Sequence, residues 1–388
     1  MSRQLQANSL NQAARRIGIN AHLLSGKAGY RRAGIHQYIY QVLRHLPDTP
    51  DAPDYFVFTQ YADEALRQQR RMQLYASRWR AENRLARILW EQVSWPLLAA
   101  RHKLDLLHSM AFVTPVLTRT PAVVTVYDLS FLHYPDRFPP LQRLYLSSQT
   151  RRSCQQARRV ITISESSRQD VHQFFHTPLT HIDAVVPGVD ASYRPRPPAE
   201  VAAFRQQRNL PDRFILHVGT LQPRKNIPTL IAALARLPDE IPLILVGGKG
   251  WLYDDIFARI TQLGLQKRVH FTGYVADADL PLWYNAAALL VFPSLYEGFG
   301  LPVVEAMACG TPVVAANTSS LPEAAGDAGL LFDPHDAAQL AERITAVLTN
   351  PDLAAAMREK GLQQASRFSW ARAGQETAAV YQRALRNL

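Results

Sequence analysis

The sequence predicts an α/β fold in which two Rossmann-like, doubly wound domains face each other across a cleft. Short runs of β-branched residues alternate with amphipathic helical patterns along the chain, and this alternation is typical of parallel sheets. The length of 388 residues fits two domains rather than one. A stretch rich in proline and polar residues, 187–200, indicates a linker between the two series of runs.

The predicted strands fall into two groups, with helical patterns between them. The first group comprises 16–21, 55–59, 104–109, 122–128, 158–164 and 181–186, and the second comprises 214–219, 243–248, 268–273, 288–293 and 311–316. We expect an N-terminal domain over residues 1–190 and a C-terminal domain over 191–369, followed by a helix with an apolar stripe at 370–388. Ligands of such sheets bind at the carboxyl ends of the strands.

The composition is that of a soluble globular protein in a reducing compartment. The only cysteines, Cys154 and Cys309, lie in no CxxC or Cys/His cluster, which argues against a disulfide framework and against structural zinc. The N-terminus has no apolar core of signal-peptide length, and no run approaches the length of a membrane span. We expect a cytoplasmic protein. Peripheral attachment to the inner face of the membrane is compatible with this expectation.

The net charge of +11 is concentrated in the first half of the chain. Residues 1–190 hold 24 Lys and Arg against 14 Asp and Glu, whereas the remainder holds 19 against 18. This excess indicates an anionic partner for the first half, such as lipid headgroups, a lipid-linked phosphate or nucleic acid. Nucleic acid is disfavoured, because no recognition module appears and aromatic residues are not interleaved with the basic runs.

Segment 67–103 carries nine Lys and Arg, two Glu and three Trp. It fits a surface that rests on an anionic membrane. It fits at least equally well a helix that packs on the sheet and turns a basic face outward.

The stretch YEGFGLPVVEAMACGTPVVA, residues 296–315, places two acids around a glycine loop that opens a helix. Gly298 and Gly300 let backbone N–H groups approach a ligand closely, and a helix start favours anions. Glu297 and Glu305 cannot bind phosphate, so as ligand-binding groups they would accept hydrogen bonds from sugar or ribose hydroxyls. Alone, the pattern is equally consistent with a helix charge and a solvated loop acid.

A second stretch, HVGTLQPRKNIPTLIAAL (217–234), has the same order of strand, glycine turn and helix start. Arg224 and Lys225 precede the helix, where cations oppose the helix dipole unless an anion lies between them. This placement indicates a phosphate site near Gly219. A solvated basic turn is the alternative. Gly34, which opens a helix after the first strand, is a weaker candidate for a phosphate-approach turn.

Together these motifs resemble those of the family-four retaining glycosyltransferases of the GT-B fold. EGFGLPVVE has the family's E-x7-E spacing, with GTLQPRKN before it and GTPVV and LPEAAGDAG after it. The variants YDLSFLHYPDRFP and LLHSMAFVTP are most similar to the mannosyltransferase branch. The resemblance runs from about Ile17 to the C-terminal helix.

The resemblance implies a role for each motif. Arg224 and Lys225 would hold the donor diphosphate, Glu297 the hydroxyls of the transferred sugar, and Glu305 the ribose. The other donor contacts would come from the turns at Gly34 and Gly219 and from the loop Gly298, Phe299, Gly300 and Leu301. Tyr274 and Val275 would lie near the base. The family needs no metal or other cofactor, and its terminal helix packs back on the N-terminal domain.

This chain departs from the family on the acceptor side. Tyr127 precedes Asp128 where the family often has a histidine, and a phenol does not act as an imidazole does near neutral pH. His36 stands in place of the family's second glycine in the first loop. These three residues and His108 are the predicted acceptor-side candidates.

The resulting prediction is a retaining glycosyltransferase that moves a hexose, with mannose from GDP-mannose favoured, to a glycan or lipid-linked acceptor of cell-surface polysaccharide. The predicted mechanism is internal return, in which the leaving phosphate assists the acceptor hydroxyl. Glu297→Ala and Lys225→Ala are each expected to abolish transfer while the fold persists. Three alternatives remain: a UDP-sugar donor, a non-catalytic binder of sugar nucleotides or polyanions, and a nucleotide-sugar epimerase.

Overall fold

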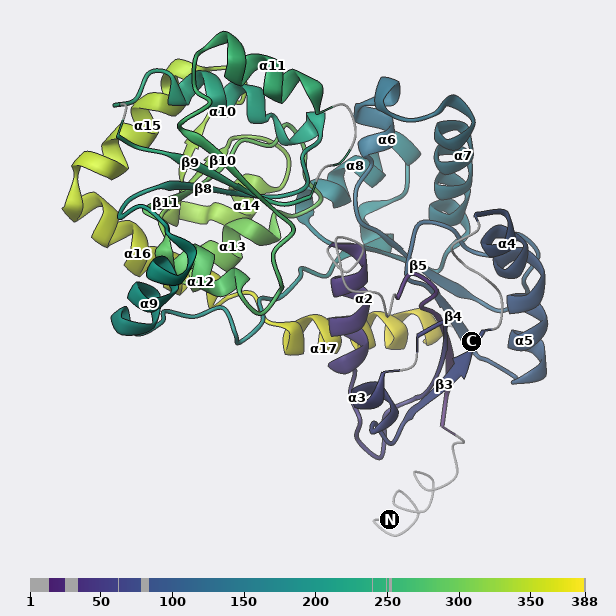
Figure 1. The fold of residues 1–388 in the computed structure, drawn as a ribbon. Coiled ribbons are helices and arrows are strands. Elements are labelled where there is room, and N and C mark those ends of the chain that lie inside the picture. The colour runs from purple at the N-terminus through teal and green to yellow at the C-terminus, as the bar shows by residue number, and fades with distance from the viewer. Residues whose placement is uncertain are drawn as a thin grey trace.

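The computed structural model describes residues 14–24, 34–61, 63–77, 84–238, 240–248, 250 and 253–386. They form two parallel sheets that lie side by side with helices on both faces (Figure 1). The first sheet has seven strands in the order β3-β2-β1-β4-β5-β6-β7, and the second has six in the order β10-β9-β8-β11-β12-β13. The predicted fold of two doubly wound domains is confirmed.

The first sheet and its helices occupy residues 16–184. Its strands are β1 (Arg16–Asn20), β2 (Asp54–Thr59), β3 (Met72–Ala76), β4 (Leu106–Ser109), β5 (Ala122–Val126), β6 (Arg159–Thr162) and β7 (Ile182–Ala184). Its helices are α2 (Ile35–Arg44), α3 (Glu64–Arg67), α4 (Arg84–Leu89), α5 (Trp95–Arg101), α6 (Ser130–His133), α7 (Pro140–Gln156) and α8 (Glu165–Phe175). A π-helical turn, Trp90–Ser94, joins α4 to α5.

The second sheet begins after the linker. Its strands are β8 (Ile215–Val218), β9 (Leu243–Val246), β10 (Val269–Gly273), β11 (Leu289–Phe292), β12 (Val313–Ala316) and β13 (Leu330–Phe332). Its helices are α9 (Pro198–Arg208), α10 (Ile227–Leu234), α11 (Asp254–Gln262), α12 (Leu280–Ala286), α13 (Leu301–Ala308), α14 (Leu321–Ala325), α15 (Ala337–Thr349) and α16 (Pro351–Ala365). The chain ends in α17 (Trp370–Leu385).

The central strands are buried because helices cover both faces of each sheet (Figure 1). Every residue of β4 and of β12 is buried, as expected for central parallel strands. Segment 67–103 is not one helix: it contains the edge strand β3 before the helical stretch 84–101. With only five residues, β3 is too short for its hydrophobic pattern to distinguish a strand from a helical segment.

Helix α17 leaves the second domain and runs beneath α2 into the first (Figure 1). Its tyrosine Tyr381 is fully buried there, and the hydroxyl lies 2.7 Å from Nδ1 of His108. Gly374 permits the close approach to the end of α2, because a Cβ atom at this position would lie 2.1 Å from the carbonyl oxygen of His45. The last helix therefore joins the two domains on the side of α2.

Among the described residues, no helix combines the length and the apolar character needed to cross a membrane.

Candidate active site

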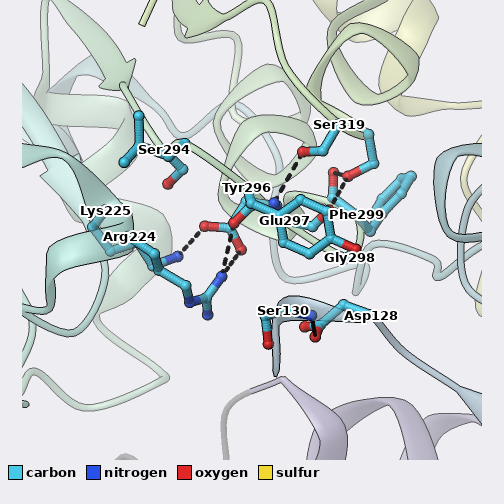
Figure 2. Close-up of polar contacts among 12 residues, drawn as sticks. Asp128, Ser130, Arg224, Lys225, Ser294, Tyr296, Glu297, Gly298, Phe299 and Ser319 are labelled. Carbon is cyan, nitrogen blue, oxygen red and sulfur yellow. Dashed lines mark hydrogen bonds and ion pairs between the residues drawn. The ribbon is translucent and has the colours of Figure 1, made fainter. Parts of the chain in front are cut away.

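The centre of the site is the carboxylate of Glu297, which two cations hold. Its Oε1 lies 2.6 Å from Nζ of Lys225, and its Oε2 lies 2.7 Å from a guanidinium nitrogen of Arg224. The same nitrogen of Arg224 also donates to the carbonyl oxygen of Tyr296. In Figure 2 both basic side chains point from one side toward Glu297. The two motifs singled out in the sequence therefore meet at one ion-pair network.

The backbone explains why the cations converge. Residues Pro223–Lys225 form a 3-10 turn, and Asn226 follows in the left-handed conformation before α10 begins. This tight turn directs both basic side chains toward the loop after β11. The anion that the sequence required between the cations is Glu297 itself. A carboxylate of the chain itself therefore meets the requirement for an anion, and a phosphate site beside the pair stays a prediction.

The network stays ionised although it is buried. Burial raises the pKa of Glu297, but Arg224 and Lys225 outweigh this effect and hold the pKa at about 2. Burial lowers the pKa of Lys225 to about 8 against the opposing effect of Glu297, so the amine is charged at neutral pH. Its Nζ also lies 4.7 Å from the ring centroid of Phe292, a favourable cation–π distance. Arg224 is the more accessible cation, with 27% of its side chain exposed against 8% for Lys225.

The glycine loop after Glu297 is fixed by serines that follow β12. The backbone N–H of Glu297 donates to Oγ of Ser319, and Oγ of Ser320 donates to the carbonyl oxygens of Glu297 and Phe299. Gly300 caps α13 with φ of +106°, a conformation that favours glycine. The N-terminus of α13 thus begins next to the acid–base network.

Glu305 lies on α13, and its carboxylate accepts a hydrogen bond of 2.8 Å from the hydroxyl of Tyr284. Burial raises the pKa of Glu305 to about 7, although the hydrogen bond from Tyr284 favours the ionised form. The two acids of the E-x7-E spacing therefore differ: Glu297 is locked as a carboxylate, whereas Glu305 titrates near neutral pH.

Asp128, at the end of β5, forms the opposite wall of the site. Figure 2 shows it with Ser130 on the segment that faces Arg224. Burial lowers the pKa of Arg224, but the carboxylates of Glu297 and Asp128 raise it by a larger amount. The two domains approach closely at Gly298, because a Cβ atom there would lie 2.5 Å from the carbonyl oxygen of Tyr127.

Tyr296, for which the motifs predicted no role, connects the glycine loop to the N-terminal domain. Its hydroxyl donates to Asp170 at 2.6 Å and accepts from the backbone N–H of Leu129 at 3.1 Å. Asp170 also pairs with Nε2 of His133 at 3.1 Å. The only signal in the sequence was the position of Tyr296 directly before Glu297.

Glu323 makes a second connection between the domains. Its carboxylate accepts hydrogen bonds from the backbone N–H groups of Glu165 (2.9 Å) and Ser166 (2.7 Å), at the N-terminus of α8. Burial raises the pKa of Glu323, and these two hydrogen bonds oppose the rise. An acid in the C-terminal half thus caps a helix of the N-terminal half.

The acceptor-side candidates other than Asp128 are committed to packing. The phenol of Tyr127 donates to the carbonyl oxygen of Met110. His36 is buried in the first turn of α2. The prediction that His108 lies in the cleft is wrong. Its ring is buried between Tyr381 and Thr125, and burial lowers its pKa to about 3.

The remaining donor-side candidates lie at the carboxyl ends of strands. Gly219 follows β8, and a Cβ atom there would meet Cε of Lys225 at 3.4 Å. Exposed Tyr274 and half-buried Val275 follow β10. Gly34 caps α2 with φ of +63°. Within the described ranges, no group of three or more His, Cys, Asp and Glu is placed to hold a metal ion.

A comparison with known proteins identifies the family. O-antigen chain mannosyltransferase B of Escherichia coli is 38% identical to this chain over 266 residues, which cover 67% of this chain and 70% of that protein. This chain belongs to glycosyltransferase family 4. The family model "Glycosyltransferase Family 4" matches residues 32–193, and the model "Glycosyl transferases group 1" matches residues 200–364. The predicted family and the predicted glycosyltransferase activity are confirmed.

Other relatives agree with this assignment. The serotype-specific mannosyltransferase WbdA of Escherichia coli is 34% identical over 224 residues, which cover 55% of this chain but only 27% of that longer protein. HepE of Anabaena, whose crystal structure contains UDP and glucose, has a TM-score of 0.72 and 23% identity, covering 95% of this chain and 99% of HepE. HepE shares the fold of this glycosyltransferase.

The ion-pair network predicts a loss of stability when its acid is removed. Glu297→Ala leaves Arg224 and Lys225 without their carboxylate in a buried setting, which costs about 3 kcal/mol of unfolding free energy. Urea denaturation followed by circular dichroism measures this loss. The matched control is Glu359→Ala, an exposed acid on α16, for which we expect a change within about 0.5 kcal/mol. Equal stability of the two variants would contradict the network.

Proposed function

We propose that this glycosyltransferase moves mannose from GDP-mannose, with retention of configuration, to a glycan or lipid-linked acceptor in cell-surface polysaccharide synthesis. The observation that carries the proposal is the Arg224–Glu297–Lys225 network beside the helix start of α13. The choice of mannose is supported by relatives that are named mannosyltransferases, one of which acts in O-antigen chain synthesis by its name.

In this proposal Arg224 and Lys225 stabilise the diphosphate that leaves with the nucleotide. Lys225 is almost fully enclosed, whereas 27% of the Arg224 side chain is exposed, so Arg224 reaches the donor first. The start of α13 adds backbone N–H groups with the positive end of the helix dipole. These groups would stabilise the leaving charge without a metal ion, and we expect transfer to persist in excess chelator.

Glu297 and Glu305 would bind the two sugars of the donor. Carboxylate oxygens accept hydrogen bonds from hydroxyl groups, so Glu297 takes the hexose and Glu305 the ribose. Both cations already hold Glu297, which fixes the acid in place before the sugar binds. In the internal-return step, the acceptor oxygen bonds to the anomeric carbon as the bond to the phosphate breaks, and the leaving phosphate takes the hydroxyl proton.

A UDP-sugar donor is the alternative within the same chemistry. HepE was solved with UDP and glucose on the same fold. On the candidate base side, the hydroxyl of Tyr274 donates to Asp277 at 3.2 Å, a contact that selects neither guanine nor uracil. The donor screen below therefore includes both nucleotides.

We also propose that the protein is cytoplasmic and contacts an anionic membrane surface through its N-terminal domain. Leu89, Val93 and Leu97 recur every four residues along the stretch from α4 to α5 and are 51%, 49% and 67% exposed. The basic residues Arg87 and Arg101 lie on the same stretch. Exposed apolar side chains flanked by arginine favour an interface with anionic lipid headgroups.

Transfer is tested with radiolabelled GDP-mannose and UDP-glucose on mannose-terminated glycans. We expect transfer from GDP-mannose, and a fall of at least about a hundredfold in Lys225→Met and Glu297→Gln, because each removes a charge that is preorganised at the reacting centre. Glu297→Gln also leaves Arg224 and Lys225 without a carboxylate, so circular dichroism must show that each variant is folded at the assay temperature before its rate is compared. The donor kcat/KM should fall as the pH rises through about 8, where Lys225 loses its proton.

Near-normal transfer by both variants would contradict the assignment. Donor binding without transfer to any glycan would favour a non-catalytic binder, and isomerised donor in the absence of acceptor would favour an epimerase.

Membrane contact is tested by sedimentation with vesicles of phosphatidylglycerol or of phosphatidylcholine. We expect binding to the anionic vesicles, and a loss of several fold when Leu89, Val93 and Leu97 are all replaced by serine. Leu362→Ser is the control, since Leu362 is also exposed (39%) but lies on α16 of the other domain. Unchanged sedimentation of the triple variant would refute this contact surface.

A further inference from the structure

Glu305 is contacted by two tyrosines that the predicted site did not include. Tyr284, on α12, donates to Oε2 of Glu305 at 2.8 Å. Tyr193 belongs to the linker between the domains, and its hydroxyl also hydrogen-bonds to the carboxylate. The centroids of the two tyrosine rings lie 6.0 Å apart. We call Tyr193, Tyr284 and Glu305 the tyrosine–acid cluster.

Both tyrosines of the cluster act as hydrogen-bond donors. Burial, together with the nearby charge of Glu305, raises the pKa of each phenol, so both phenols keep their protons. Their hydrogen bonds favour the ionised form of Glu305 and oppose the effect of burial on its pKa. Tyr284 is fully buried and Tyr193 is half-buried, whereas Glu305 is partly exposed. A ligand can therefore reach the acid while the phenols hold it from behind.

The other titratable groups that face Glu305 make its charge harder to keep. Asp277, in the loop after β10, and Asp190, in the linker, carry like charges and raise the pKa of Glu305 beyond the effect of burial. Cys309, at the end of α13, stays a neutral thiol because burial raises its pKa to about 12. The two phenols thus act against burial and against two acids.

Hydrogen bonds on both sides of Tyr193 hold its segment of the linker. Before it, Asp190 accepts from Nε2 of Gln41 of α2, in the N-terminal domain, at 3.3 Å. After it, the backbone N–H of Arg196 donates to Oδ1 of Asn285 of α12, in the C-terminal domain, at 2.8 Å. The linker is therefore attached to both domains where it places Tyr193 against Glu305.

The hydrogen-bonding capacity of the acid matches a vicinal diol. A carboxylate offers about four lone-pair sites to donors. The two phenols use two of them, and the rest suit the adjacent 2′ and 3′ hydroxyls of a ribose. A protonated carboxyl replaces one of these acceptor sites by a donor, so the charged form is the one that accepts from both hydroxyls.

We propose that Tyr193 and Tyr284 are positioning residues for the ribose of the donor, because they hold Glu305 as an oriented carboxylate whose remaining lone pairs accept from two ribose hydroxyls. The linker is then part of the donor site as well as the connection between the domains. This inference rests on the proposed function, since it concerns the donor of the same reaction.

The test compares the Kd of GDP with that of 2′,3′-dideoxy-GDP, by isothermal titration calorimetry from about pH 5.5 to about pH 9. Both nucleotides carry guanine and the diphosphate, so the titration of Lys225 affects both alike and cancels in the ratio of the two constants. The ratio therefore reports the ribose hydroxyls alone, and a readout of transfer is not needed.

In the wild type we expect GDP to bind about tenfold more tightly than the dideoxy form above about pH 8. This advantage should fall as the pH falls through about 7, where Glu305 takes up a proton. Tyr193→Phe and Tyr284→Phe each remove a donor to the charged form, so the midpoint of the fall should move up by about one pH unit. A loss of packing alone would lower the advantage at every pH without moving the midpoint.

Two further variants serve as references. Glu305→Gln should give a ratio that does not change with pH, because the titrating group is gone. Tyr61→Phe is the matched control, since the Tyr61 phenol also donates to a carboxylate, that of Asp63 at 3.4 Å, but in the N-terminal domain. It should follow the wild-type curve. Far-ultraviolet circular dichroism checks that each variant is folded.

The outcomes separate this inference from the proposed function. A wild type that does not bind GDP overturns the proposed donor, and the same comparison then uses UDP and its dideoxy form. If the wild type binds both guanine nucleotides equally, or if the folded variants keep the wild-type midpoint, the positioning role is refuted while the donor assignment stands. If Tyr284→Phe fails to fold, Tyr193→Phe alone decides between these results.

Discussion

The salt bridges from Glu297 to Arg224 and Lys225 are the interaction on which the rest of the site depends. A buried carboxylate with a single partner is costly, and a buried lysine alone loses its proton. Here each group keeps the other charged, and the network lies between the turn after β8 and the loop after β11. The glycine loop, its serine contacts and the start of α13 take their positions from this acid.

The second constraint is the closeness of the two domains. Gly298 leaves no space for a side chain against the carbonyl of Tyr127. Tyr296 hydrogen-bonds across the boundary to Asp170, and Glu323 caps α8 from the opposite domain. These contacts bring Asp128 to the donor side without any covalent connection except the linker and α17. The same loop therefore binds cations on one face and fixes the domain boundary on the other.

Local sequence patterns predicted the fold but not the pairing of side chains. Alternation of strand and helix indicated both sheets, while edge strands β3 and β13 were missed because they have only five and three residues. The meeting of Lys225 and Glu297, 72 residues apart, depends on the order of strands in the sheet. Likewise, α17 buries His108 from a distance of 273 residues, so no local pattern could show that this histidine is structural.

The most direct measurement is the affinity of GDP-mannose for the wild type and for Lys225→Met, by isothermal titration calorimetry at pH 7. If the cation held by Glu297 binds the donor diphosphate, the wild type binds and Lys225→Met binds at least about tenfold more weakly, because a charge-assisted contact of about 1.4 kcal/mol or more is lost. Equal affinities in the two folded proteins would show that the network is only structural and that the donor binds elsewhere.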